Sequence, residues 1–235
     1  TGKPGPVVVC VPVDVGAANF DFKDRKKPGL GAIYPGSRSA PDPEDVKRAC
    51  QAILDAKKPV LVVGGGAHIS GCYSQIRNLT EHLRAPILTS ISGKGIIEET
   101  HPQSFGVTGT FGNPIAQEIF KAADLVFFIG CKAGQLTTFG YQIPDQNTAV
   151  IHLDADPEEI GRNYPDSIPL VADASLGLDA VIASMVGMKP AVDWDFESYK
   201  QKLQNWHQEI IKPEMGSEGR LRPQAIMGAV KQILT

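Results

Sequence analysis

Residues 57–71 read Lys-Lys-Pro-Val-Leu-Val-Val-Gly-Gly-Gly-Ala-His-Ile-Ser-Gly, and this stretch decides the fold class. Proline opens an apolar run over residues 59–63, and Gly64, Gly65 and Gly66 close it. So short an uninterrupted run is typical of a strand buried on both faces, as in a parallel sheet. A helical pattern follows over residues 70–83. We therefore predict a strand, a sharp turn and a helix.

The three glycines allow two interpretations. Glycine lets the backbone turn sharply and approach another group closely, and a following helix points unpaired N–H groups at that place. The glycines then border an anionic ligand, or they only make a tight strand-to-helix turn. A dinucleotide fingerprint is incomplete here, because Ile69 stands in the third glycine position. The next predicted strand ends in Thr89 and Ser90 instead of an acidic residue, which weakens the hypothesis of an NAD-dependent dehydrogenase.

Composition narrows the class of protein. The chain has 235 residues and a formal net charge of -3, with acidic and basic residues interspersed. The sequence carries no basic stripe for nucleic acid and no apolar run long enough to span a bilayer, and no signal-peptide pattern opens it. The four cysteines are scattered without a CxxC pair, so we expect neither zinc nor disulfides. We predict a cytoplasmic protein with free thiols.

Further elements follow from local signals. Residues 5–15 are predicted to be a strand that Pro12 ends, and the Gly/Pro-rich residues 16–40 to be a linker. Asp42 and Asn113, each followed by proline, are predicted helix caps. Five strands are predicted, at residues 59–63, 86–90, 124–130, 148–154 and 167–171. Helices are predicted at residues 42–54, 70–83, 114–123, 158–163 and 175–186, and two more at 194–211 and from 221 onward.

This alternation predicts an α/β fold: a doubly wound, mostly parallel, Rossmann-like sheet with helices on both faces, over residues 41–187. Residues 91–112 show neither a helical nor a strand period of apolar residues, but they are rich in glycine and in side-chain hydroxyls. Such loops bind ligands at the carboxyl ends of parallel strands. The five histidines share no metal-ligand or nucleophile–base spacing, so we predict no catalytic and no metal-binding residue. For Asp156, before Pro157, we favour helix capping over a carboxylate pair with Asp154.

The order of motifs resembles the middle of a thiamine-diphosphate-dependent enzyme of the acetolactate synthase type, over nearly the whole chain. The motifs are Gly64-Gly65-Gly66, Gly93-Lys94-Gly95, Gly106-Val107-Thr108-Gly109, Ala123-Asp124-Leu125, Ile151-His152-Leu153-Asp154, Asp156-Pro157, Asp173-Ala174 and Leu221-Arg222-Pro223. The resemblance implies the end of a pyrimidine-binding domain at 1–15, a linker at 16–40, a central domain at 41–187, a linker with a helix at 188–219 and the start of a pyrophosphate-binding domain at 220–235.

It also implies that the parent enzyme acts on 2-oxo acids as a carboligase or decarboxylase. The activating glutamate and the motif for magnesium and diphosphate would lie in flanking domains outside this chain, so the chain alone is not catalytic. The parent would be a homo-oligomer, either a dimer or a tetramer.

In relatives the central domain binds FAD, ADP or nothing. By resemblance, the nucleotide would lie along Gly64, Gly65, Gly66, Thr89, Ser90, Gly106, Val107, Thr108, Gly130, Lys132, Asp154, Ala155, Asp173 and Ala174. Asp154 would accept from ribose or adenine, and Lys132 would meet a phosphate. FAD-binding members carry arginines after the glycine at position 130, where this chain has Lys132, Gly134, Gln135 and Leu136, and lysine lacks the arginine fork. FAD, an ADP-like ligand and an empty site all remain open, as do an NAD-type enzyme and a purely structural spacer or oligomerisation domain.

Overall fold

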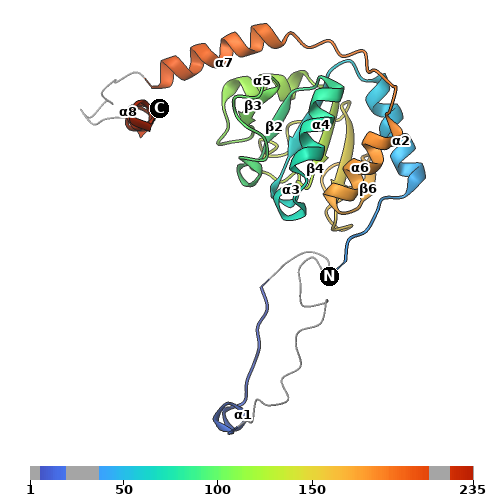
Figure 1. The fold of residues 1–235 in the computed structure, drawn as a ribbon, viewed down its shortest axis with the longest axis vertical. Helices are drawn as coiled ribbons and strands as arrows, with labels where there is room; N and C mark the ends of the chain where they lie inside the picture. The colour runs from blue at the N-terminus through green and yellow to red at the C-terminus, as the bar shows by residue number, and fades with distance from the viewer. Residues whose placement is uncertain (1–5, 20–36, 212–222, 235) are drawn as a thin grey trace.

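The computed structural model describes residues 6–19, 37–211 and 223–234, and its centre is a six-stranded parallel sheet (Figure 1). The strand order is β3-β2-β1-β4-β5-β6. The strands are β1 (Pro59–Val63), β2 (Ile87–Thr89), β3 (Ser104–Val107), β4 (Leu125–Ile129), β5 (Ala149–Asp154) and β6 (Ile168–Val171). β1 and β4 pair in register from Pro59↔Leu125 to Val63↔Ile129. The chain winds outward from β1 to β3, crosses back to β4 and winds outward again, as the predicted doubly wound fold requires.

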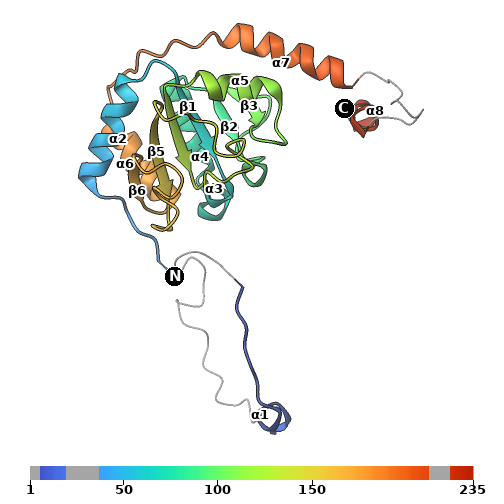
Figure 2. The same cartoon turned by 180° about the vertical axis from the view of Figure 1, so that it is seen from behind.

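Helices cover both faces of this sheet (Figures 1 and 2). α2 (Pro43–Asp55), α4 (Tyr73–Leu83) and α6 (Ala174–Ser184) enclose one apolar cluster with Leu61 and Val63. α5 (Pro114–Ala122) and α7 (Phe196–Ile210) enclose the other, with Val60 and Val62. Successive side chains of a strand point to opposite faces, so the single run of β1 fills both cores.

The predicted helix caps are confirmed. The Asp42 side chain accepts a hydrogen bond from the Glu44 N–H, and the Asn113 side chain accepts one from the Ala116 N–H. Asp173 caps α6 in the same way, accepting from Ser175 and Leu176. These caps fix where each helix leaves the sheet edge, because they satisfy N–H groups that the helix itself cannot pair.

The predicted helix over residues 70–83 is wrong at its start. The chain forms α3 (Gly65–Ser70) directly after Gly64, and α4 begins only at Tyr73. Gly71 separates the two helices with a φ of 72°, the left-handed conformation that ends many helices. Gly65 and Gly66 therefore lie inside the first turn of a helix, with Gly64 as its N-cap, rather than before a helix.

Two further predictions need correction. β3 falls in residues 91–112, where no strand was predicted. This stretch carries no clear strand signal because the four residues of β3 include Gly106, and the register of β3 against β2 is irregular. The helix predicted at 158–163 does not form, and the segment is a series of turns. Asp156 accepts a hydrogen bond from the Glu158 N–H, but Gly161 takes a φ of 74° and stops helical propagation. A 3₁₀ turn, η3 (Ile91–Gly93), follows β2.

The strand predicted at residues 5–15 is not observed in the described residues. Residues 6–12 have no regular structure, and α1 (Val13–Ala17) follows them. Val7, Val8 and Val9 are each at least 78% exposed. No strand of the described chain pairs with them, and a single strand without a hydrogen-bonded neighbour is not stable.

The other predictions at the ends of the chain fall only partly within the described residues. Most of the predicted linker, residues 20–36, lies outside them. The last predicted helix is observed as α8 (Pro223–Leu234), whereas residues 212–222 again lie outside the described part. None of the described helices combines the length and the apolar character needed to cross a membrane.

Candidate functional site

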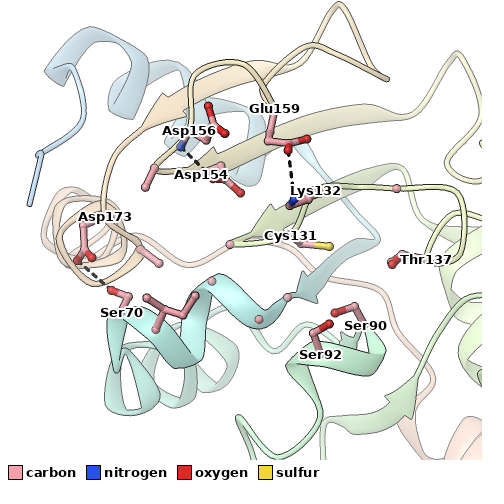
Figure 3. Close-up of a pocket in the computed structure, with 18 of the residues that line it drawn as sticks. Ser70, Ser90, Ser92, Cys131, Lys132, Thr137, Asp154, Asp156, Glu159 and Asp173 are labelled. Carbon is pink, nitrogen blue, oxygen red and sulfur yellow. Dashed lines mark hydrogen bonds and ion pairs between the residues drawn. The ribbon is translucent and has the colours of Figure 1, made fainter. Parts of the chain in front are cut away.

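A cavity of about 670 Å³ lies at the carboxyl ends of the strands (Figure 3). Its wall includes Gly64 after β1, Gly130 after β4 and Asp154 at the end of β5. β1 and β4 are the neighbours between which the chain reverses its direction of winding. Ligands of open α/β sheets bind in the crevice at such a switch point, and volumes of about 300–1,000 Å³ are usual for ligand sites.

Most of the residues predicted from the sequence line this cavity. They are Gly64, Gly65, Gly66, Ser90, Thr108, Gly130, Lys132, Asp154, Ala155, Asp173 and Ala174. Thr89, Gly106 and Val107 are not part of the wall. They lie within β2 and β3 rather than beyond the strand ends, and the Thr89 carbonyl accepts a hydrogen bond from the Thr108 N–H. The sheet brings segments more than 100 residues apart to one edge, as parallel pairing demands.

Other wall residues were not predicted from the sequence. They are Ser37, Arg38, Ser39, Ile69, Ser70, Ile91, Ser92, Gln135, Thr137, Asp156 and Glu159, with Gly134 and Leu136. Cys131 also lines the cavity and lies within the stretch 130–132 that the resemblance implies. Cys131 to Thr137 directly follow a predicted strand, so their position after its carboxyl end was a usable signal. Arg38 had no such signal, because it lies in a segment without periodicity that was predicted to be a linker.

The glycines after β1 are explained by close packing of two turns. A Cβ on Gly64 would lie 2.3 Å from the Gly130 carbonyl oxygen, and one on Gly66 would lie 2.9 Å from the Gly130 Cα. The Gly64 N–H donates to Ile129 O and the Gly66 N–H to Gly130 O, both at 2.9 Å. The tight-turn interpretation therefore accounts for Gly64 and Gly66 without a ligand, and the N–H groups of both are already donated within the protein.

Carboxylates gather on one side of the cavity (Figure 3). Asp154 accepts a hydrogen bond from the Asp156 N–H at 3.0 Å, and burial raises the pKa of the Asp154 carboxyl. Glu159 is only 4% exposed, and its two oxygens lie 3.4 Å from Lys132 Nζ and 3.5 Å from an Arg162 nitrogen. Lys132, the predicted phosphate contact, is thus ion-paired with a buried carboxylate of the protein.

A second polar network closes the cavity beside α6. Arg38 Nη1 donates to the Ser70 carbonyl at 3.0 Å and to Asp173 Oδ1 at 3.2 Å. The Ser70 hydroxyl donates to the same carboxylate oxygen at 2.9 Å and accepts from the Ser175 N–H at 2.8 Å. The Asp173 N–H donates to Ser39 O. This network fastens residues 37–39 to the domain and makes them one wall of the cavity.

Hydroxyls and apolar side chains form the remaining wall. Ser90 and Ser92 lie opposite the carboxylates (Figure 3), and the Ser90 hydroxyl accepts a hydrogen bond from the Gly93 N–H. Thr108 is 1% exposed, and within the described structure its Oγ1 has no hydrogen-bond partner. A buried hydroxyl left unpaired costs about 1–3 kcal/mol. Ile69, Ile91 and Leu136, each at least half exposed, add apolar surface.

Burial suppresses the reactivity of the histidine and the cysteine at this edge, His152 and Cys131. His152 is 2% exposed and its Nε2 lies 2.8 Å from Cys131 O. Burial lowers the pKa of His152, so its ring is held neutral, and burial raises the pKa of the Cys131 thiol to about 11. A thiol that stays protonated at neutral pH is a poor nucleophile and metal ligand. Among the residues that the structure describes, no three His, Cys, Asp or Glu side chains gather as a metal site.

The parallel sheet and the cavity at its carboxyl edge define a Rossmann-like α/β domain, and comparison with known sequences agrees with this class. The family described as thiamine pyrophosphate enzyme, central domain, matches residues 46–181. The chain belongs to this family of central domains.

Individual relatives are acetolactate synthase subunits. The chain is 34% identical over 186 residues to a probable acetolactate synthase large subunit of Methanococcus aeolicus, covering 79% of this chain and 31% of the relative. It is 31% identical to the acetolactate synthase large subunit of Haemophilus influenzae, covering 99% of this chain and 41% of that protein. It is 30% identical to the acetolactate synthase isozyme 3 large subunit of Escherichia coli, covering 97% and 40% respectively. The chain thus spans less than half the length of these relatives.

Proposed function

We propose that this chain supplies the central domain of a longer thiamine-diphosphate-dependent enzyme that ligates or decarboxylates 2-oxo acids, and that the chain does not catalyse the reaction alone. The names of its relatives support the reaction class. When bound, thiamine diphosphate supplies the carbanion-stabilising chemistry. The described residues do not fit that cofactor or Mg²⁺, because they offer no cluster of metal ligands and no activated nucleophile or base. We assign both to parts of the parent outside this chain.

A turnover assay tests this assignment. The purified chain is incubated with pyruvate, thiamine diphosphate and Mg²⁺, and acetolactate and carbon dioxide are measured. We expect no product from the chain and product from the full-length parent under the same conditions. Turnover by the chain alone would show that its own side chains carry the chemistry.

We further propose that the cavity binds an adenine nucleotide, of the FAD or ADP type that the family resemblance implies. The observation that carries this proposal is the cavity itself, a hollow at the switch point between β1 and β4 that eleven of the predicted residues line. Asp154, at the end of β5, is placed to accept hydrogen bonds from ribose hydroxyls or an amino group. Thr108 adds a buried hydroxyl that lacks a protein partner.

A purely structural domain is the second candidate. It is favoured by Gly64 and Gly66, whose packing against Gly130 explains both glycines without a ligand. An NAD-type enzyme is disfavoured by Ile69 in the third glycine position and by Ser90 at the end of β2, where such sites carry an acidic residue.

Ligand release and titration separate these candidates. The chain is purified and denatured, and the supernatant is analysed by absorbance and mass spectrometry. FAD, ADP and NAD are then titrated into the native chain by calorimetry. An adenine compound that is released or bound supports the site, and binding of NAD alone supports the NAD-type enzyme. Absence of any binding would leave the structural domain.

The parent's assembly and location complete the proposal. We infer flanking domains on both sides of the chain, because the matched family is a central domain and the relatives are more than twice as long. We also infer a homo-oligomeric parent, a dimer or tetramer, located in the cytoplasm. The four cysteines are free thiols, which suits a reducing compartment. Size-exclusion chromatography with light scattering of the full-length parent tests the oligomeric state.

A further inference from the structure

Arg38 is the only arginine in the cavity wall among the residues that the structure describes. The other cation of the wall, Lys132, pairs with the buried Glu159 carboxylate at 3.4 Å. An arginine presents its N–H donors as a planar fork that matches two oxygens of a phosphate, whereas a lysine is a point charge. Of the two cations, Arg38 is therefore the better suited to a phosphate group of a ligand.

The protein uses only one nitrogen of the Arg38 guanidinium. Nη1 donates to the Ser70 carbonyl at 3.0 Å and to Asp173 Oδ1 at 3.2 Å. Within the described part of the chain, Nε and Nη2 donate no hydrogen bond, and the side chain is 38% exposed. Two phosphate oxygens can bind this free edge of the fork while Nη1 keeps its contact with Asp173. A ligand phosphate therefore need not displace the carboxylate.

The Asp173 carboxylate holds this fork in place. Besides Arg38, its Oδ1 accepts from the Ser70 hydroxyl at 2.9 Å and from the N–H groups of Ser175 and Leu176. Asp173 is also the N-cap of α6, so the positive end of the helix dipole offsets part of its charge. With Nη1 bonded to both Ser70 and Asp173, the guanidinium is ordered before a ligand arrives. An ordered donor loses less conformational entropy on binding.

The segment that carries Arg38 is lightly attached to the domain. Residues 37–39 line the cavity, are exposed and belong to no helix or strand. Apart from the Arg38 contacts, the attachment found among the described residues is the Asp173 N–H, which donates to Ser39 O at 3.0 Å. Ion pairs that face solvent contribute little to holding such a segment. A phosphate bound to Arg38 would therefore add substantially to its attachment.

We propose, resting on the adenine nucleotide site proposed above, that Arg38 binds a phosphate of the nucleotide through Nε and Nη2. Arg38 is then the residue that makes the cavity prefer a nucleotide to a nucleoside. The bound phosphate also fastens residues 37–39 against the cavity, because it links the ligand to a segment that the domain holds mainly through Asp173.

Calorimetric titration of the full chain with ADP and with adenosine at neutral pH tests this role. We expect the unsubstituted chain to bind ADP on the order of tenfold more tightly than adenosine, as one hydrogen bond to a charged group supplies. Arg38→Met should abolish most of this difference, and Arg38→Lys should keep only part of it, because lysine lacks the fork. Arg48→Met is the matched control, since it makes the same charge change on α2 outside the wall and should keep the ratio.

The ratio of the two affinities is the decisive quantity, because Arg38→Met also removes contacts with Ser70 and Asp173 and can weaken adenosine too. Lys132→Met tests the other cation of the wall. If the unsubstituted chain does not prefer ADP, if the preference survives in Arg38→Met, or if only Lys132→Met loses it, the role of Arg38 is overturned and the adenine site stands. If neither compound binds the unsubstituted chain, the proposed site fails and this inference fails with it.

Limited proteolysis of the unsubstituted chain gives a second readout that needs no variant. Trypsin cleaves after arginine, and mass spectrometry follows the cleavage between Arg38 and Ser39. We expect saturating ADP to slow this cleavage more than saturating adenosine does, because only ADP carries the phosphate that fastens the segment. Equal protection by the two compounds would contradict a contact between Arg38 and the phosphate.

Discussion

Replacing Gly64 by alanine decides between the two interpretations of the glycine turn. The new Cβ would lie 2.3 Å from Gly130 O and 2.6 Å from the Cys131 Cα. The carbon–carbon contact is about 0.9 Å inside the roughly 3.5 Å separation that non-bonded carbons prefer, the carbon–oxygen contact is shorter still, and both involve backbone. The turns are tied by the hydrogen bond from the Gly64 N–H to Ile129 O, so neither can move without losing pairing at the sheet centre.

We expect Gly64→Ala to lower the free energy of unfolding by about 3 kcal/mol, the upper part of the range for forced overpacking. For a domain of this size, that corresponds to a fall in Tm of roughly 6–12 °C. Urea denaturation followed by circular dichroism measures it. Gly134→Ala is the matched control in the same cavity wall, because a Cβ there has no heavy atom within 4 Å beyond its chain neighbours. If both variants are equally stable and only Gly64→Ala loses ligand, Gly64 serves a ligand instead of packing.

Three further predictions concern buried polar groups. Burial lowers the pKa of His152, so the folded state resists its protonation, and stability should fall as pH drops below about 6.5. Between pH 7.5 and 5.5 the urea midpoint should fall less in His152→Gln than in the unsubstituted chain. The control His82→Gln, at an exposed histidine, should behave as the unsubstituted chain does. Lys200 donates to His101 O and Ser104 O, so Lys200→Met should loosen α7 and cost about 1–2 kcal/mol. Hydrogen exchange should show faster opening of α7 in Lys200→Met than in the exposed control Lys202→Met. Thr108→Val should stabilise the free chain by about 1 kcal/mol, because it removes an unpaired hydroxyl, and should weaken binding of an adenine nucleotide. A destabilised variant would show that Thr108 Oγ1 has a partner.

Local signals in the sequence located the carboxyl ends of the strands well. The family resemblance supplied Asp154 and Gly130 as site residues. The apolar run before each agrees with that choice, because parallel pairing brings such strand ends to one edge. Thr89 and Val107, also taken from the resemblance, lie within β2 and β3 and not in the cavity wall, since the true strand ends depend on register with neighbours. Arg38 was missed because its contacts with Ser70 and Asp173 span 32 and 135 residues of sequence.

The class of fold follows from the order of residues alone. Apolar runs such as residues 59–63 are short, continuous and bounded by glycine or proline, and amphipathic helices separate them, so burial on both faces of a parallel sheet is the arrangement that hides them. The order of motifs likewise identified the family, which the match over residues 46–181 shows.

The partners of the polar residues at the sheet edge, by contrast, are set by the folded chain. The sequence offers Gly64, Gly66, Lys132 and Asp173 as ligand groups, since each residue type can bind a nucleotide. The folded chain commits the glycine N–H groups to β4, Lys132 to Glu159 and Asp173 to Arg38 and α6. The reason is that a hydrogen bond or ion pair forms only when two groups from distant parts of the chain are positioned to within a few tenths of an ångström. Residue order alone does not contain those positions.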